Sequence, residues 1–288
     1  MNSAPCFLGV DLGGTQMRMA VVTGEGRLAT DVVSVPTGKA FGPGHLRQGL
    51  LDLRQRLRPA LDNRAGVALG FGTAGIVDRG PLTQCNNLPL LNGTDLGKLL
   101  REAADGPVAL ENDARCFTLA EARYGAGRGA QDVCGITLGT GVGCGVMVGG
   151  RLHRGAGSQA GEVYRIPLRG HPLEDFLSGA GVVRGYEAAG GRPSAALDAQ
   201  GIAALARTGD AAAGTAWRSF GEDLAFLCAS VIALLDPAVI VIGGSLSRAR
   251  DLYAAVLASR LEEYPTRIAE AALGPAAGVI GAAALNME

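Results

Sequence analysis

A Gly-rich segment near the N-terminus, Asp11-Leu-Gly-Gly-Thr15, has residue types that suit phosphate and magnesium. It follows the apolar run Cys6–Val10, which predicts a buried strand leading into a tight turn. The adjacent Gly13 and Gly14 can bend the backbone with φ > 0 and let a phosphate approach without meeting a Cβ, and the threonine adds a hydroxyl. The aspartate, at the strand end, is placed to hold a hydrated Mg²⁺.

Two further Gly-rich strand ends follow, Gly139-Thr140-Gly141 and Gly243-Gly244. The first would offer backbone N–H groups and a hydroxyl to the same polyphosphate. The second precedes a predicted helix and would let an adenosine lie flat against the backbone. Each turn alone is more often an ordinary hairpin. Three in one chain favour a nucleotide site.

Acid–base chemistry is indicated by Glu111-Asn112-Asp113, which follows a predicted strand and precedes a helix. The alternative is a helix N-cap, where Asn and Asp are favoured. A cap does not need three such residues in a row. Asn112 can bind a sugar-like hydroxyl, and Asp113 can accept its proton. Glu162 is a second candidate carboxylate, although alone it reads as a surface residue.

The hydrophobic pattern predicts strands and helices that place these residues at strand ends or turns. The expected strands are 8–10, 17–22, 28–35, 66–71, 107–110, 133–138, 143–148 and 238–242. The expected helices are 45–61, 96–104, 115–124, 211–235, 246–261 and 276–285. A strand–turn–strand unit with a phosphate-type turn occurs near residue 13 and again near residue 140. This repetition predicts an α/β protein with two related lobes and a ligand cleft between them.

Composition excludes several classes of protein. The net charge of −1 over 288 residues implies no broad basic surface for nucleic acid. None of the six cysteines forms a C-x-x-C pair, so they are interpreted as reduced thiols of a cytoplasmic protein. A strand begins within about five residues of the N-terminus, so no signal peptide is expected. No apolar stretch is long enough to span a membrane.

In these motifs the chain resembles the ROK sugar kinases, which have the two-lobed actin-like ATPase (ribonuclease H-like) fold. The similar segments lie in the family's order from Leu8 to Gly244. They are Asp11–Arg18, Gly70–Asp78, Asn86–Pro89, Glu111–Ala114, Leu138–Gly143, Arg154–Ala156, Ala160–Glu162, Asp236-Pro237 and Ile240–Gly244.

The resemblance implies an ATP- and Mg²⁺-dependent kinase that phosphorylates a sugar hydroxyl, with Asp113 as the general base. The residues expected to line the sugar are Gly75, Asn86, Asn112, Asp113, Glu162 and Glu174. The residues expected to bind nucleotide are Asp11, Gly13, Gly14, Thr15, Arg18, Gly139, Thr140, Gly141, Gly243 and Gly244, with Asp11 on the metal through water. A homodimer is expected from the family alone.

The chain departs from the family where zinc normally binds. The family continues Gly-Glu-x-Gly-His, whereas here Arg165 stands at the histidine position, after Tyr164. The following loop is about ten residues shorter and has no cysteine, so a zinc site of the three-Cys, one-His type is not expected. Ala74 also replaces a proline. Whether Arg165 or Tyr164 fills the place of the histidine stays open.

Three functions follow from this reading. The first is a kinase for the 6-hydroxyl of glucose or a related hexose; allose, mannose, fructose and N-acetylhexosamines remain open. The second is a catalytically weak sugar- or nucleotide-binding protein. The third is a sugar-responsive regulator, disfavoured because no DNA-binding domain precedes the first strand. Residues 1–114 with 275–288 are expected to form the smaller lobe, and residues 115–274 the larger.

Overall fold

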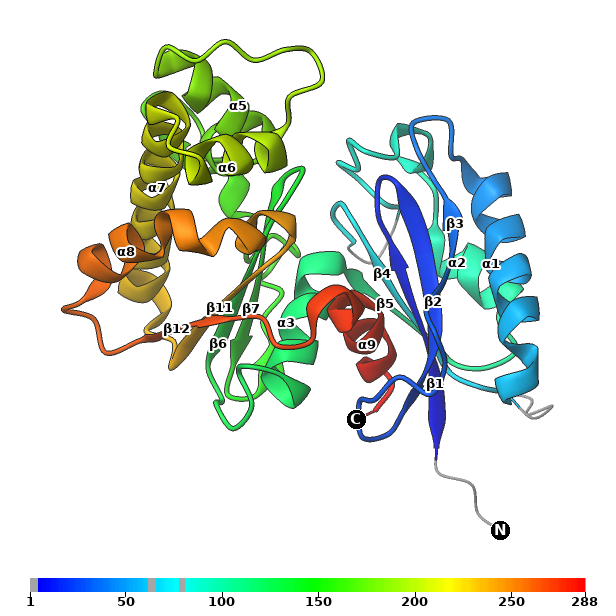
Figure 1. Cartoon of the computed structure of the whole chain (residues 1–288). Helices are drawn as coiled ribbons and strands as arrows, with labels where there is room; N and C mark the ends of the chain where they lie inside the picture. The colour runs from blue at the N-terminus through cyan, green and yellow to red at the C-terminus, as the bar shows by residue number, and fades with distance from the viewer. Residues whose placement is uncertain (1–4, 62–65, 78–80, 288) are drawn as a thin grey trace. The chain divides into compact units, whose positions relative to one another are not determined.

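The computed structural model describes residues 5–61, 66–77 and 81–287 and divides the chain into two compact units. Unit 1 contains residues 1–129, 152–160 and 272–288, and unit 2 contains residues 130–151 and 161–271. Each unit has a five-stranded mixed sheet. Helices pack on each sheet, as Figure 1 shows. The chain is therefore an α/β protein with two lobes, as the sequence predicted.

The sheet of unit 1 has the order β3-β2-β1-β4-β5. The strands β1, β2 and β3 form an antiparallel meander, and β4 and β5 continue the sheet in parallel with β1. The strands are β1 (Cys6–Leu12), β2 (Gln16–Thr23), β3 (Val33–Pro36), β4 (Leu69–Thr73) and β5 (Val108–Asn112). Because β1, β4 and β5 run parallel, their carboxyl ends lie at one edge of the sheet.

Helices cover both faces of this sheet (Figure 1). The helices α1 (Pro43–Leu57) and α2 (Leu96–Ala103) pack on one face, and the helices α3 (Asp113–Tyr124) and α9 (Ala277–Ala284) pack together against β1 and β4 on the other. Short 3₁₀ turns occur at Arg58–Leu61, Pro89–Leu91 and Gly274–Ala276. The C-terminal helix thus completes the core of the N-terminal sheet.

The sheet of unit 2 has the order β12-β11-β6-β7-β8. The strand β6 pairs antiparallel with β7 and parallel with β11, which pairs parallel with β12. The strands are β6 (Val133–Leu138), β7 (Val142–Val148), β8 (Arg151–Leu152), β11 (Val239–Gly243) and β12 (Arg267–Glu270). A separate hairpin is formed by β9 (Pro167–Leu168) and β10 (His171–Pro172).

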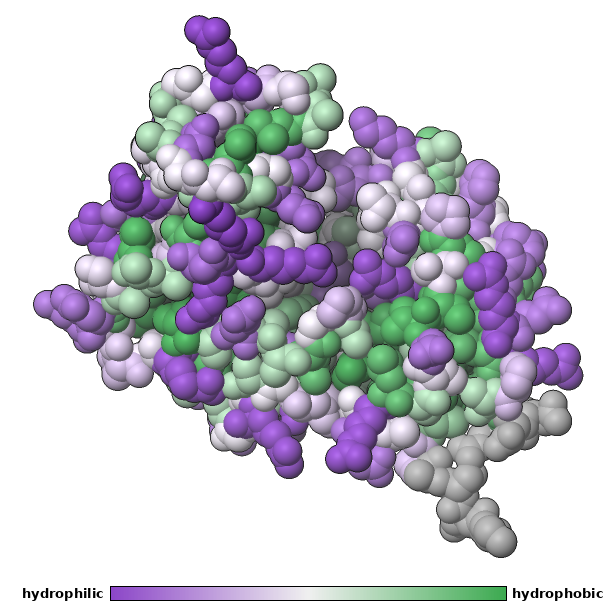
Figure 2. Space-filling view, viewed as in Figure 1, coloured by the Kyte–Doolittle hydropathy of each residue, from purple (hydrophilic) through white to green (hydrophobic). Residues whose placement is uncertain are grey.

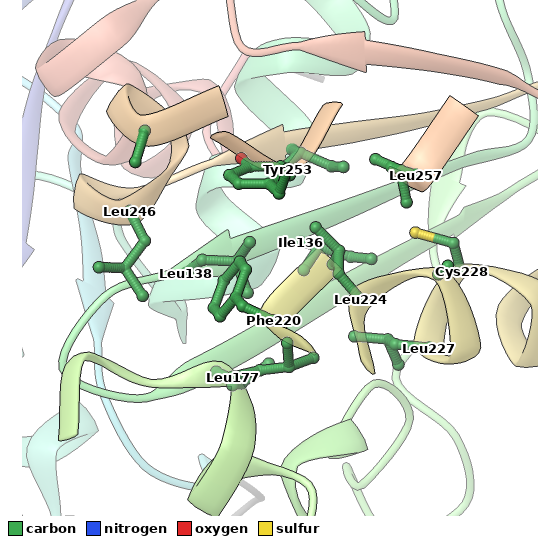
Figure 3. Packing of buried hydrophobic residues seen from close by; sticks show 14 of the residues in the cluster. Ile136, Leu138, Leu177, Phe220, Leu224, Leu227, Cys228, Leu246, Tyr253 and Leu257 are labelled. Carbon is green, nitrogen blue, oxygen red and sulfur yellow. The ribbon is translucent and has the colours of Figure 1, made fainter. Parts of the chain in front are cut away.

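The helices of unit 2 pack around one long helix, α7 (Ala211–Leu235). Its neighbours are α4 (Glu174–Leu177), α5 (Gly179–Ala188), α6 (Ala199–Arg207) and α8 (Arg250–Leu261); 3₁₀ turns occur at Val163–Arg165 and Ser245–Ala249. In Figure 3, Phe220 and Leu224 of α7 lie against Ile136 and Leu138 of β6, within one buried cluster. This core fixes the sheet edge that carries the second Gly-rich turn.

Most predicted elements agree with the structure, and the differences have local causes. The strand 133–138 and the helix 211–235 have the predicted bounds. The expected strand 28–35 is only Val33–Pro36, with an isolated bridge at Leu28. The helices α5 and α6 were not predicted, because Gly and Ala dilute their apolar periodicity. Asp78, the end of one family segment, lies outside the described residues.

The boundaries of the two units differ from those that the sequence suggested. Residues 115–129 belong to unit 1 rather than to the larger lobe, and residues 152–160 also belong to unit 1. The reason for the first difference is that α3 packs against α9, which in turn packs on β1 and β4. The second segment is joined to unit 1 by Arg115, which donates hydrogen bonds to the carbonyls of Ser158 and Ala160.

The surface and the cysteines fit the composition of the chain. Polar and apolar side chains are interspersed over the face seen in Figure 2. All six cysteines lie in described segments, and none forms a disulfide. Within residues 5–61, 66–77 and 81–287, no helix combines the length and the apolar character that a membrane crossing needs.

Candidate active site

In unit 1, Asp11, Asn112 and Asp113 lie at the edge formed by the carboxyl ends of three neighbouring parallel strands, whereas the candidate sugar residues Glu162 and Glu174 belong to unit 2. Residue pairing places Asp11 of β1 opposite Gly72 of β4, and Gly72 opposite Glu111 of β5. Asp113 follows β5 directly as the first residue of α3. Ligands in such α/β folds bind at this edge of the sheet.

The first Gly-rich turn needs glycine because a neighbouring side chain leaves no room for a Cβ, not because its backbone is left-handed. Neither Gly13 nor Gly14 has a positive φ, so the expectation that they bend the chain in this way is wrong. A Cβ on Gly14 would instead lie 2.7 Å from Cβ of Asn87, which only glycine allows. Thr37 braces the turn by donating its hydroxyl to the carbonyl of Gly13 at 2.8 Å. The turn and the Asn86-Asn87 segment are therefore in contact.

Two carboxylates at this edge, Asp11 and Asp113, repel one another. Burial, with a smaller contribution from Asp113, raises the pKa of Asp11 to about 6, and Arg18 partly opposes the rise. Burial also raises the pKa of Asp113, although Ala114 N–H donates to its Oδ1 at 2.9 Å. A divalent cation would relieve this repulsion, so the pair suits a hydrated Mg²⁺.

The pair makes a testable contribution to stability. Between about pH 4 and pH 6 the folded protein retains a proton on Asp11 that the unfolded chain has released. The free energy of unfolding therefore falls as the pH rises through this window, by at most about 3 kcal/mol. Denaturant unfolding of the wild type and Asp11→Asn at several pH values measures the difference. Identical pH profiles for the two proteins would contradict the assignment.

Asn112 caps α3 and connects the strand ends. Its Oδ1 accepts the N–H groups of Ala114 and Arg115 at 3.0 and 3.2 Å, as an N-cap does. Its Nδ2 donates to the carbonyl of Gly75 at 3.1 Å, and Gly75 has φ +92. The N-cap alternative thus applies to Asn112, whereas Asp113 begins the helix with one carboxylate oxygen bound to the backbone.

The second Gly-rich turn lies in unit 2, at the end of β6. Gly139 N–H donates to the carbonyl of Gly141 at 3.0 Å, and Thr140 is exposed. Glu174 accepts the N–H of Val142 at 3.0 Å, and its Oε2 would lie 2.3 Å from a Cβ on Gly141. The carboxylate of Glu174 therefore contacts this turn; its expected contact with the sugar stays a prediction.

A cavity of about 460 Å³ opens beside this turn in unit 2. Gly139 and Thr140 lie at its wall together with residues from α5, α6 and the 3₁₀ turn after Gly244. Gly244 has φ +90, and a Cβ there would lie 2.2 Å from the carbonyl of Leu138, so the backbone approaches β6 closely. The wall also includes Trp217 and Arg207, which the sequence analysis missed.

The segment at the expected zinc position folds as a short hairpin. The strands β9 and β10 are joined by Arg169 and Gly170, both with positive φ, as a two-residue hairpin turn requires. Before it, Arg165 donates its Nε–H to the hydroxyl of Tyr164 at 2.9 Å. Glu162 precedes this pair as the N-cap of a 3₁₀ turn.

Comparison with known proteins identifies the class. The two α/β units and their Gly-rich strand ends define an actin-like ATPase fold. Residues 7–288 match the ROK family model, so the chain belongs to the ROK family and is a sugar kinase of glucokinase-like type.

Individual relatives are similar along most of their length. A glucokinase from Halalkalibacterium halodurans is 31% identical over 313 residues, which cover 96% of this chain and 93% of the relative. An N-acetylgalactosamine kinase from Shewanella is 30% identical, with 97% and 96% coverage. The crystal structure of a ROK family glucokinase from Streptomyces griseus with glucose and AMPPNP is similar at a TM-score of 0.81 and 26% identity, covering 97% of this chain and 98% of that one.

Proposed function

We propose that this protein transfers the γ-phosphoryl group of ATP to a hydroxyl of glucose or a related hexose, with Asp113 as the general base. The observation that carries the proposal is the carboxylate pair Asp11 and Asp113 at the carboxyl edge of the unit 1 sheet. Their raised pKa values suit one group that accepts a proton and one that faces a cation. The related glucokinases support the same reaction.

In the proposed reaction, Asp113 holds the acceptor hydroxyl and takes its proton. As the sugar oxygen bonds to the γ-phosphorus, the bond from that phosphorus to the β,γ-bridging oxygen breaks, and ADP leaves. Such reactions depend on positioning and charge stabilisation more than on covalent catalysis. Asn112 orients the sugar while capping α3, and Gly75, Asn86, Glu162 and Glu174 complete the proposed sugar site.

The nucleotide is assigned to the cavity in unit 2. Its volume of about 460 Å³ suits an adenosine. Arg207 lies at its wall, and a terminal guanidinium nitrogen of Arg207 donates to Oδ1 of Asp251 at 2.6 Å. The phosphates are assigned to Gly13, Gly14, Thr15 and Arg18 of unit 1 and to Gly139, Thr140 and Gly141 of unit 2. Gly243 and Gly244 are assigned to the adenosine. Exposed N–H groups in such turns bind anions.

Asp11 is assigned to the metal. When Mg²⁺ is bound, it neutralises charge that develops on the phosphates. The residues present fit this role, because the carboxylates of Asp11 and Asp113 repel one another and a bound cation would offset this repulsion. We expect no zinc requirement, which metal analysis of the purified protein and activity after chelation and readdition of Mg²⁺ will test.

The test of the function is an ADP-release assay with Mg-ATP over hexoses and N-acetylhexosamines. Turnover on one sugar names the substrate. The N-acetylgalactosamine kinase among the relatives makes the N-acetylhexosamines the main alternative substrates. Binding of ATP and sugar without ADP release on any member of the panel would favour the catalytically weak binding protein instead.

A variant that fills the cavity tests the nucleotide assignment. Ser245 lies at the cavity wall beside Gly139 and is exposed. We expect Ser245→Trp to raise the KM for ATP by roughly tenfold or more, equivalent to about 1.4 kcal/mol of binding, with the sugar KM unchanged. The matched control is Ser259→Trp, on the exposed side of α8. Equal ATP KM values for both variants would refute the assignment.

A further inference from the structure

Arg115 is a buried charge without a role in the proposed chemistry. It follows Asp113 on α3, and its side chain is 1% exposed. Its guanidinium donates to Glu111 Oε1 at 3.0 Å and, through the other terminal nitrogen, to the carbonyls of Ser158 and Ala160 at 2.7 and 3.1 Å. One side chain therefore joins residues that are more than forty positions apart.

In the bound segment, residues 152–160, Ser158 is buried, Leu152 and Ala160 are partly buried, and the other residues are exposed. Ser158 has φ +53, a left-handed conformation that residues other than glycine rarely adopt. Such a backbone persists only where surrounding contacts enforce it. The bond from Arg115 falls on the carbonyl of this residue. The segment thus depends on contacts from α3 for its conformation.

Glu111, which directly precedes Asn112 and the proposed base Asp113, makes further hydrogen bonds in the same network as Arg115. Its Oε1 also accepts the N–H of Asn112 at 2.9 Å, and its Oε2 accepts Arg154 Nε–H at 2.5 Å. Residues 152–160 are therefore held to Glu111 twice, directly through Arg154 and indirectly through the bonds of Arg115 to Ser158 and Ala160. Buried ion pairs often cost more free energy in desolvation than they return, so they are weak evidence for a purely stabilising role. The five hydrogen bonds of this network instead favour a role in positioning.

We propose that Arg115 is a positioning residue for the sugar: its guanidinium fixes residues 152–160 to Glu111. This holds the backbone that continues to Glu162, two residues after Ala160, and the backbone of Asn112 and Asp113. The proposal rests on the proposed function. Arginine is needed because its planar fork reaches a carboxylate and two carbonyls at once, which a lysine ammonium cannot reproduce.

The test compares Arg115→Met and Arg115→Lys with the wild type. We expect kcat/KM for the sugar to fall about 100-fold through a higher sugar KM and a lower kcat, because the network positions Asp113 as well as the sugar site and small displacements of reacting groups are costly. The KM for ATP should be unchanged. Amide exchange in residues 152–160 should accelerate about 10- to 100-fold, the equivalent of a charge-assisted hydrogen bond. The lysine variant should rescue neither measurement fully.

The matched control is Arg123→Met, on the same helix. Arg123 donates to the carbonyl of Ala284 at 3.0 Å and so joins α3 to α9. It should lower the melting temperature without changing the sugar KM or the exchange of residues 152–160. If Arg115→Met behaves like Arg123→Met, the arginine is only structural and the proposal is wrong.

Two further measurements separate the possible failures. If Arg115→Met does not fold, the test uses Arg154→Ala, which removes the other, more exposed side chain that binds Glu111. This variant must raise the sugar KM and the amide exchange rate of residues 152–160, or the proposal is wrong. The wild-type assay on the sugar panel decides the proposed function separately. Exchange that stays slow in folded variants overturns the inference even if the wild type is an active kinase.

Discussion

Replacing Asp113 by Asn is expected to lower kcat by about 10²–10⁴-fold, the range typical of losing a general base. The amide keeps an oxygen that can accept the N–H of Ala114, as the carboxylate does at 2.9 Å, so α3 should still begin at this residue. The sugar dissociation constant should change little. The ADP-release assay measures turnover, and calorimetry measures sugar binding.

A matched control is Asp95→Asn, at the start of α2 in the same unit. Asp95 caps that helix by accepting the N–H of Lys98 at 2.8 Å, and Asn caps helices equally well. Its activity should equal that of the wild type. Normal turnover by Asp113→Asn would show that the base has been assigned to the wrong residue, and would leave the fold and the family unaffected.

The largest expected effect on stability comes from Gly70→Ala, at the second residue of β4. A Cβ at this position would lie 1.7 Å from the carbonyl oxygen of Ala282 on α9, a distance that requires the helix or the strand to move. We expect a loss of about 3 kcal/mol, the upper part of the usual range for overpacking. Denaturant unfolding, followed by circular dichroism, measures the change.

Gly214→Ala is the control for the same substitution. Gly214 lies in α7, and a Cβ there meets nothing within 4 Å. Alanine should stabilise the helix by up to about 1 kcal/mol relative to glycine. The opposite signs of the two effects separate crowding from backbone propensity. Equal free energies of unfolding for Gly70→Ala and the wild type would mean that α9 does not pack on β4 as described.

The two glycine predictions illustrate why some features escape a sequence-based reading. Gly70 is one of many glycines in strands, and its need for a missing Cβ comes from a helix more than 200 residues later. Gly14 was interpreted as a residue for positive φ, whereas Asn87 excludes a side chain there. Glycine permits both conditions, so its presence alone does not distinguish them.

The sequence by itself determined the class of the fold, the family and the strand ends that carry the candidate site. Turn residues, hydrophobic periodicity and the segment Glu111-Asn-Asp113 are local signals, because each is read within a few residues. They placed β6 and α7 correctly and brought Asp11, Asn112 and Asp113 to one edge of a sheet.

Tertiary structure alone decided the contacts between residues far apart in the chain. These are the bonds of Arg115 to Ser158 and Ala160, the contact of Glu174 with the second Gly-rich turn, and the membership of α3 in unit 1. Nothing in the local sequence around Arg115 marks it as buried, since a helical arginine usually lies in solvent. Its role follows from packing, which brings distant backbone carbonyls to a charge that must be paired when it is buried.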